Sequence, residues 1–245
     1  MKLPAFTTFT GVDVHTDIDR LQDLSARFPV EWGVLISEKW SGADGALRYP
    51  QVDWIQNLYD KGLNLSLHLC NGLAYDFAKV TAGLPVVSSV VDLHQFQRVQ
   101  INYHVTLEQL ASAVRNFHGS VIAQLFDEKT ILKIDPLLAL PNDAHRVHLL
   151  WDGSGGAGVL PGHWPEPEGG FFHRTIYGWA GGLGPDTVPD HLPRIAKAAQ
   201  HPKVDAWYID MESWVRRRDN DHFDLDACEK VLQQVEEFKQ RAEGE

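Results

Sequence analysis

Apolar and polar positions follow two alternating periods along the whole chain. Short runs of apolar and β-branched residues alternate with longer stretches in which apolar residues recur at helical spacing. The predicted strands are Ala5–Thr10, Glu31–Ser37, Asn64–Asn71, Arg98–Tyr103, Ser120–Phe126, Arg146–Asp152, Arg174–Ala180 and Val204–Met211. The predicted helices are Asp17–Arg27, Val52–Lys61, Leu107–Phe117, Val188–Gln200 and Leu225–Arg241.

The last predicted helix has the clearest pattern. Apolar residues recur from Leu225 to Phe238 against a face of Glu, Lys and Gln, which is typical of a helix with one buried stripe. Asp224 or Asp226 is placed to cap its first turn.

Strict alternation of strands and helices predicts a parallel sheet, because parallel neighbours need a crossover connection. Eight such units in 245 residues favour an α/β fold of the TIM (β/α)₈ barrel type, a closed eight-stranded parallel sheet. Residues 1–245 would then form a single domain. An open, doubly wound sheet is the structural alternative.

Composition and charge narrow the possible partners. An apolar fraction of 44% and eight tryptophans supply a large core. The formal net charge of −11 argues against nucleic acid and anionic membranes as partners, because neither is approached by an acidic body without a basic stripe. The basic run Arg216–Arg218 is expected on a solvated loop face.

The chain also shows no apolar leader and no run near the roughly 20 apolar residues that span a bilayer. We therefore expect a soluble, cytoplasmic protein. Cys70 and Cys228 lie in a predicted strand and a predicted helix, without metal-binding or redox spacing, so separate reduced thiols are expected.

Two predicted strands end abruptly in glycines. The sixth runs into G-S-G-G-A-G, and the seventh runs into A-G-G-L-G-P-D before a helix. Glycines at the end of a strand let backbone N–H groups approach a ligand, and a following helix favours an anion. The long connection Gly153–His173 is either a lid or binding element at this rim or irregular packing in place of a helix.

Motifs in the same order resemble a known family. The first strand ends T-F-T-G-V, the second is followed by L-R-Y-P, the fourth carries V-Q-I-N, the seventh continues as A-G-G-L-G-P-D-T-V, and the eighth ends I-D-M-E-S-W-V-R. These segments are similar to K-I-C-G-I, S-P-R-Y, V-Q-L-H, G-G-L-N-P-E-N-V and D-V-S-S-G-V-E of phosphoribosylanthranilate isomerase, the small (β/α)₈ enzyme of tryptophan biosynthesis. The G-G-L-x-P motif is the most specific.

The resemblance implies an Amadori rearrangement of a sugar phosphate. A general acid protonates the ring oxygen of the ribose, and a general base then removes the proton on the adjacent carbon. Asp152 matches the catalytic acid and Thr10 replaces the catalytic cysteine of the family. A threonine hydroxyl is not a base at neutral pH, so the base is unassigned. Asp13 is a candidate, although an ordinary position in the loop before the first helix is the stronger interpretation.

Asp152 has a second interpretation. An aspartate before glycines often caps a turn, and aligning the leucines of the sixth strand puts Trp151 rather than Asp152 at the catalytic position. Only one of the two side chains can point into a barrel, because strand residues alternate in facing.

The resemblance also implies substrate-binding residues. Arg48 matches an arginine of the second loop, although an exposed salt bridge would equally explain it. Asp210 matches a substrate-contacting aspartate of the eighth strand, or it binds loop amides. Gln100 and Asn102 share one face of a strand and are expected at the mouth of the barrel.

The phosphate is expected at Gly181 and Gly182, with Gly156 and Gly158 (and Gly155) completing the cradle and Ser213 matching a phosphate-contacting serine. Glu212 and Trp214 replace a serine and a glycine of the family pattern, so the clamp is either reshaped or built for another anion. We expect a small anionic metabolite as partner, and the resemblance implies a phosphorylated one; the oligomeric state is not predicted.

His68 allows a different chemistry. With a neighbouring carboxylate it would form a divalent-metal site of the epimerase type, but a hydrogen-bonded core histidine is the favoured interpretation. We expect no cofactor and no metal. The alternatives to the isomerase are thus a barrel enzyme with a metal-assisted or different acid–base mechanism, and a small-molecule-binding barrel without catalysis.

Overall fold

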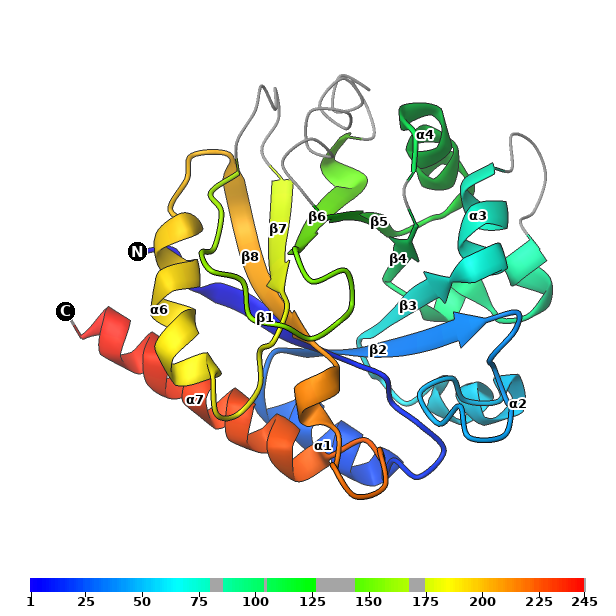
Figure 1. Ribbon diagram of the computed structural model, residues 1–245, viewed down its shortest axis with the longest axis horizontal. Helices are drawn as coiled ribbons and strands as arrows, with labels where there is room; N and C mark the ends of the chain where they lie inside the picture. The colour runs from blue at the N-terminus through cyan, green and yellow to red at the C-terminus, as the bar shows by residue number, and fades with distance from the viewer. Residues whose placement is uncertain (80–85, 104, 127–143, 168–174, 245) are drawn as a thin grey trace.

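Eight parallel strands close into a barrel in the computed structural model (Figure 1). The structure describes residues 1–79, 86–103, 105–126, 144–167 and 175–244. Each strand pairs with its neighbours in chain order, and β1 pairs with β8 to close the ring. The predicted TIM barrel is confirmed, and the open sheet is excluded.

The strands match the predicted ones to within one residue at almost every end. They are β1 (Pro4–Thr10), β2 (Val30–Ser37), β3 (Leu65–Cys70), β4 (Arg98–Asn102), β5 (Ser120–Leu125), β6 (Val147–Asp152), β7 (Thr175–Ala180) and β8 (Val204–Met211). The predicted start of β7 at Arg174 lies outside the described residues.

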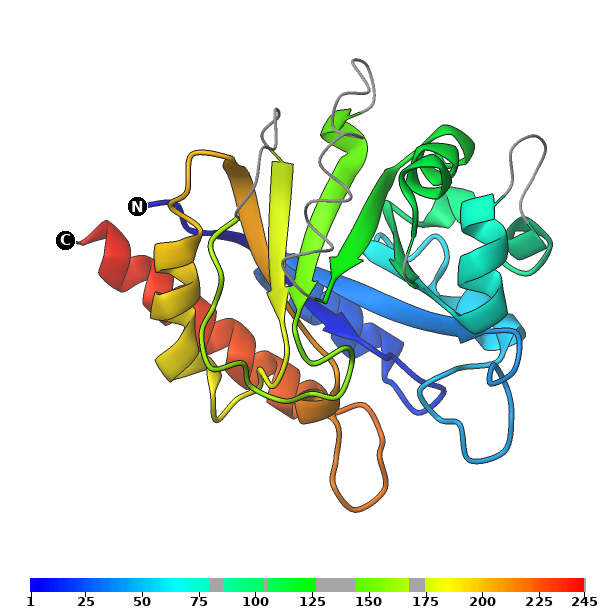
Figure 2. The same cartoon turned by 45° about the horizontal axis from the view of Figure 1, so that its top comes forward.

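The α-helices cover the outside of the barrel (Figure 2). They are α1 (Ile18–Arg27), α2 (Val52–Ile55), α3 (Asn71–Lys79), α4 (Leu107–Asn116), α6 (Val188–Ala198) and α7 (Leu225–Glu243). Short 3₁₀ turns occur at Gln56–Leu58, Val86–Ser89, Leu93–Gln95, Ala144–Arg146 and Ser213–Val215. As predicted, Asp224 caps α7: its carboxylate accepts hydrogen bonds from the N–H groups of Asp226 and Ala227.

One expectation about helices was wrong. The predicted helix Val52–Lys61 is a single α-turn continued by a 3₁₀ turn, and Tyr59 is already extended. Helix α3 was not among the predicted helices, and its first residue, Asn71, was assigned to the preceding strand. Asn71 begins the helix with a φ of 55°, a conformation that asparagine tolerates better than most residues.

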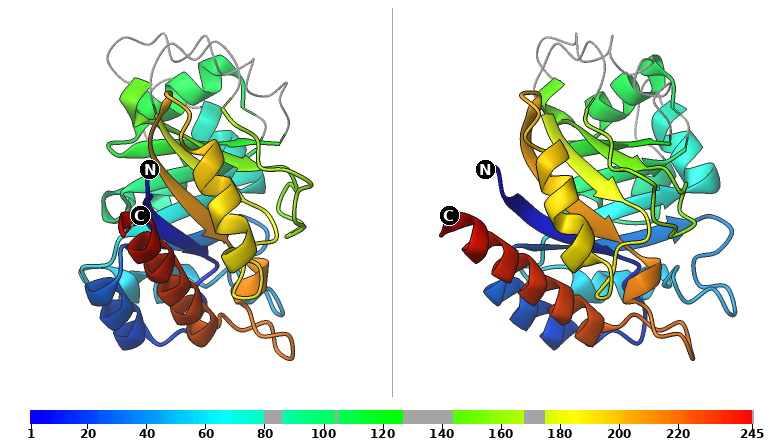
Figure 3. Two further views of the ribbon diagram at one scale, coloured as in Figure 1. Left: turned by 90° about the vertical axis from the view of Figure 1, so that its left-hand side faces the viewer. Right: turned by 60° about the vertical axis from the view of Figure 1, so that its left-hand side comes forward.

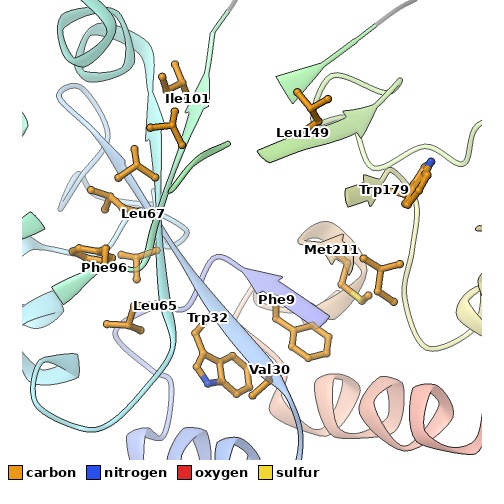
Figure 4. Packing of buried hydrophobic residues seen from close by; sticks show 14 of the residues in the cluster. Phe9, Val30, Trp32, Leu65, Leu67, Phe96, Ile101, Leu149, Trp179 and Met211 are labelled. Atoms are coloured by element: carbon orange, nitrogen blue, oxygen red, sulfur yellow. The ribbon is translucent and has the colours of Figure 1, made fainter. Parts of the chain in front are cut away.

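The main apolar core lies between the barrel and its helices. Trp32, Trp179 and Trp207 are fully buried there, and Figure 4 shows Phe9, Trp32 and Met211 among its members. Helix α7 packs beside α1 and α6, as Figure 3 shows from the side. These three tryptophans thus hold the helices onto the sheet rather than filling the barrel.

The barrel interior is mainly polar. Toward the N-terminal ends of the strands, Glu31 and Arg98 form a fully buried ion pair, with Arg98 Nε 2.6 Å from Glu31 Oε2. The guanidinium lies against the rings of Phe6 and Tyr208, 4.7 and 4.3 Å from their centroids. Burial opposes ionisation of Glu31, but the charge and the hydrogen bonds of Arg98, together with the smaller effects of His68 and Thr8, lower the pKa of Glu31.

Gly178 makes room for this arrangement. A Cβ atom at this position would lie 2.3 Å from the ring of Tyr208, so no larger residue fits without moving that ring. The small residue on β7 is therefore paired with the large one on β8, as close packing inside a barrel requires.

Both cysteines are buried and unpaired, as predicted. No helix among the described ranges is both long and apolar enough to cross a membrane.

Candidate active site

A small cavity opens at the carboxyl ends of the strands, the rim at which barrel enzymes carry their active sites. Its volume is about 80 Å³. Ten of the residues predicted for the site line it, from five strands and the loops that follow them: Thr10, Gln100, Asn102, Asp152, Gly156, Gly158, Gly181, Gly182, Asp210 and Ser213.

Asp210 is the most unusual acid of this cavity. It points inward near the end of β8, with 5% of its surface exposed. Burial raises its pKa from 3.8 to about 7, and the hydrogen bond from Thr10 only partly offsets this. A carboxyl group with a pKa near neutrality can both accept and donate a proton at physiological pH.

Thr10 donates its hydroxyl hydrogen to Asp210 Oδ1 at 2.8 Å. Gly33, opposite on β2, leaves the room for this contact, because a Cβ atom there would lie 2.6 Å from Thr10 Oγ1 and 3.1 Å from His68 Nε2. The threonine that replaces the family's cysteine is thus a hydrogen-bond partner of the candidate acid.

We expect Thr10→Val to raise the pKa of Asp210 by roughly one further unit, because the lost hydrogen bond stabilises the ionised carboxylate and such bonds are worth about 1.5–3 kcal/mol. The measurement is a ¹³C NMR titration of the Asp210 carboxyl carbon, with Thr10→Ser as the matched control that keeps the hydroxyl. An unchanged midpoint in Thr10→Val would show that Thr10 does not tune Asp210.

Asp152 points inward, whereas Trp151 packs into the outer core, which settles the register of β6. The Asp152 carboxylate accepts hydrogen bonds from Ser154 N, Ser154 Oγ, Gly156 N and Gln124 Nε2, at 3.1, 2.6, 2.7 and 3.0 Å. Each oxygen accepts two of them, which suits a carboxylate that organises the loop better than one that carries a proton. These contacts agree with the interpretation of Asp152 as a residue that caps the turn after β6.

Five glycines with positive φ shape the loops after β6 and β7. The φ angles are 61°, 88°, 66°, 111° and 67° at Gly155, Gly156, Gly158, Gly181 and Gly182. A Cβ atom on Gly182 would lie 2.4 Å from Leu160 N, so glycine is required for the two loops to touch. Within the described chain, the N–H groups of Gly181 and Gly182 donate no hydrogen bond, and both residues line the cavity.

Glu212 and Trp214 lie beside Gly158, Gly181 and Gly182, which together with Ser213 form what we call the glycine seat. Glu212 lines the cavity, and burial raises its pKa despite the nearby Arg48. Trp214 Nε1 donates to the carbonyl oxygen of Gly158 at 2.8 Å, which joins the loops after β6 and β8. The residues that depart from the family pattern are thus part of the cavity wall.

Arg48 does not line the cavity. Its guanidinium binds Glu212 through Nη1 at 2.8 Å and Asp221 through Nη2 at 3.0 Å. These contacts agree with the interpretation of Arg48 as a salt-bridge residue. Its charge is compensated by the two carboxylates of the loop after β8.

The expectation of a solvated loop was wrong for Arg216. This side chain is 1% exposed and binds the fully buried Asp13 at 2.8 Å, while Nη1 donates to the carbonyl oxygen of Gly11. Asp13 also accepts from the N–H of Phe223 at 2.8 Å. These contacts tie the loop after β1 to the loop after β8 and make Asp13 a structural residue, as its favoured interpretation stated.

Gln100 and Asn102 both face the cavity and are joined by a hydrogen bond of 2.8 Å from Gln100 Nε2 to Asn102 Oδ1. The Oε1 atom of Gln100 is buried without a hydrogen-bond partner in the described part of the chain. A buried acceptor of this kind is ready to bind a hydroxyl group of a ligand.

His68 lies in the wall of the cavity, with Nε2 3.0 Å from Ser66 Oγ. Burial lowers its pKa to about 4, so the imidazole is neutral at physiological pH. No cluster of three or more His, Cys, Asp or Glu side chains suited to a metal occurs among the residues that the structure describes.

Sequence reasoning did not single out Gln124 and Ser154, which complete the cavity and bind Asp152. Two signals were available in the sequence: Gln124 occupies an inward-facing position of a predicted strand, and Ser154 follows the end of another strand by two residues. The loop after β6 packs along α6: Trp164 Nε1 lies 3.0 Å from His191 Nδ1. Phe171 and Phe172, in the same predicted loop, lie outside the described residues.

Comparisons with known proteins support the fold but identify no function. No family model and no curated protein sequence matches the chain. Among solved structures it resembles phosphoribosyl anthranilate isomerase from Thermococcus kodakaraensis, with 15% identity, a TM-score of 0.53, and coverage of 94% of this chain and 98% of that one. It also resembles 3-hexulose-6-phosphate synthase from Salmonella typhimurium, with 11% identity, a TM-score of 0.50, and coverage of 97% and 99%. At these identities the likeness shows a TIM-barrel fold.

Proposed function

We propose that this chain is a barrel isomerase that moves a proton on a small sugar phosphate, in the manner of phosphoribosylanthranilate isomerase. The observation that carries the proposal is Asp210, a buried carboxyl group with a pKa of about 7 at a cavity on the catalytic rim. Perturbed carboxyl groups of this kind mark sites of acid–base chemistry.

Asp210 takes the place of the missing base. Its ionised form removes the proton from the carbon next to the carbonyl or iminium group, and the electron pair of that C–H bond forms the double bond of an enol or enolamine. The protonated Asp210 returns a proton to the substrate, so the carboxyl group leaves the cycle as it entered. Thr10 orients it throughout.

Asp152 lies across the cavity from Asp210. Both residues pair with Ala180 of β7, one from each side, so their backbones are two strand spacings, about 10 Å, apart. A substrate carbon between them would meet a proton carrier on one side and a carboxylate on the other. The second carboxylate stabilises positive charge as an iminium or oxocarbenium ion develops.

The phosphate is proposed at the seat formed by Gly158, Gly181, Gly182 and Ser213, with Gly156 beside it. Support comes from the bare N–H groups of Gly181 and Gly182, since backbone amides bind phosphate without a charged side chain. Of the residues that the structure describes, no Lys or Arg lines this cavity, whereas Asp152, Asp210 and Glu212 do. Within that part of the chain, the backbone N–H groups are therefore the source of positive potential at the seat.

The proposal is tested by incubating the protein with phosphoribosylanthranilate, and separately with aldose phosphates of five and six carbons, in deuterium oxide. Proton abstraction by Asp210 predicts deuterium on the carbon next to the carbonyl, detected by NMR, with a rate that rises with pH up to about 7. Binding of a sugar phosphate without any exchange or turnover would support the non-catalytic alternative instead.

A further inference from the structure

A second, larger hollow lies beside the central cavity, on the other side of Trp214. Its volume is about 380 Å³, and we call it the outer cavity. Gly158, Ser213 and Trp214 line both hollows and form the wall between them. The other residues that line the outer cavity lie mainly in residues 184–187, just before α6, and in the loop after β8.

The central cavity is too small for a whole substrate. Its volume of about 80 Å³ falls well below the 300–1,000 Å³ that is typical of small-molecule sites, whereas the outer cavity falls within that range. A substrate whose reacting carbon lies at Asp210 must therefore extend out of the central cavity, and the outer cavity is adjacent.

Arg218 distinguishes the outer cavity electrostatically. Its guanidinium lies 5.4 Å from the centroid of the Trp214 ring. Arg48 and Arg216 are held by Glu212, Asp221 and Asp13, but no carboxylate of the described residues lies within ion-pair distance of Arg218.

The outer cavity also contains an acid, Asp186. This residue is exposed and lies 3.4 Å from the ammonium group of Lys230, which offsets its charge. Among the described residues, three carboxylates and no Lys or Arg line the central cavity, so the side-chain charges favour placing a further anionic group of the substrate in the outer cavity.

Trp214 is held loosely between the two hollows. One hydrogen bond, from Nε1 to the carbonyl oxygen of Gly158, fixes the indole, and 45% of the residue is exposed. Loss of that one bond would free the indole to turn, because nearly half of the residue is exposed to solvent.

We propose that the outer cavity binds a second anionic group of the substrate, a phosphate or carboxylate that lies beyond the glycine seat and contacts Arg218, and that Trp214 turns aside to admit it. This inference rests on the proposed function, since the substrate class is taken from it. Arg218 thereby determines specificity for anionic substrates, and an arginine suits both candidate groups because it binds their oxygens in pairs.

The test is binding of inorganic phosphate, followed by ³¹P NMR, to the full chain and to Arg218→Ala. Arg217→Ala is the matched control: it removes the same charge from the neighbouring position, and Arg217 is exposed, lies 3.9 Å from Asp224 and does not line the outer cavity. We expect Arg218→Ala to weaken phosphate binding about tenfold and Arg217→Ala to change it less than twofold, with the difference shrinking as salt is added.

Equal affinities in the two variants would overturn the assignment of Arg218 while leaving the glycine seat in place. Absence of phosphate binding to the unmodified chain would overturn the inference as a whole. The acid–base role of Asp210 would still be judged separately by deuterium exchange on neutral sugars, so the two failures are distinguishable.

The movement of Trp214 has its own readout. In ¹⁵N-labelled protein the indole N–H resonance of Trp214, assigned by its loss in Trp214→Phe, should shift on addition of phosphate as its bond to Gly158 breaks. A resonance that stays in place at saturating phosphate would contradict the movement.

Discussion

Asp210→Asn is expected to lower kcat/KM by about 10³-fold, within the range of 10² to 10⁴ that general acid–base catalysis contributes. The amide has nearly the shape of the carboxyl group and its oxygen can still accept the hydrogen bond of Thr10, so the fold should be retained. The amide cannot take up a proton, however. Turnover or deuterium exchange of the sugar phosphate measures the loss.

The same substitution should raise stability at alkaline pH. The pKa of Asp210 is about 7 in the folded chain and 3.8 without its surroundings, so the folded state binds more protons between these values. Stability from this group is fully present below about pH 4 and is lost as pH rises to about 7. Each pKa unit is worth about 1.4 kcal/mol, so the loss is on the order of 4 kcal/mol.

Asp210→Asn should therefore be more stable than the unmodified chain at pH 8 and nearly equal to it at pH 4, as measured by denaturant unfolding at both values. Asp53→Asn, on the exposed side of α2, is the control and should change neither activity nor the pH dependence. Retained activity in Asp210→Asn would assign the proton transfer to another group.

Arg98→Met is expected to cost about 3–5 kcal/mol of stability at pH 7, because it leaves Glu31 buried and unpaired. Methionine replaces most of the volume of the side chain, so the lost charge rather than a void dominates. Guanidinium unfolding measures the effect. The pKa of Glu31 is lowered in the native pair, so that stability is present at neutral pH and declines as pH falls.

Two comparisons make the Arg98 result interpretable. Arg20→Met removes an exposed arginine whose partners are the exposed Asp226 and the partly buried Glu229, and it should cost under about 1 kcal/mol. Combining Arg98→Met with Glu31→Gln removes both charges and should recover part of the loss. If the double variant is no more stable than Arg98→Met, packing of the guanidinium against the rings of Phe6 and Tyr208 matters more than its charge.

Sequence patterns predicted the members of the site better than their roles. Thr10, Asp152 and Asp210 were each expected at the rim because each ends, or nearly ends, a predicted strand, and parallel strands bring such ends together. Asp152 was matched to the acid through its place in the motif order. Its hydrogen bonds to Ser154, Gly156 and Gln124 depend on the conformation of the glycine loop, which the pattern does not specify.

Charged residues of the loops were the least predictable. Arg216 follows apolar and aromatic residues in a stretch that is rich in charge, and nothing nearby in the sequence marks Asp13 as its partner. The two are separated by 203 positions along the chain. Arg48 and Glu212 are likewise 164 positions apart.

By itself, the sequence determined the order of strands and helices, the closed parallel barrel and the rim at which the polar residues gather, because periodicity and glycine-tipped strand ends are local properties of the chain. Only the tertiary structure decided which carboxyl group is suited to carry a proton. Burial of Asp210 and its bond to Thr10, 200 positions away, arise only when β8 closes the barrel against β1. Electrostatic environment depends on neighbours in space, and those neighbours come from distant parts of the chain.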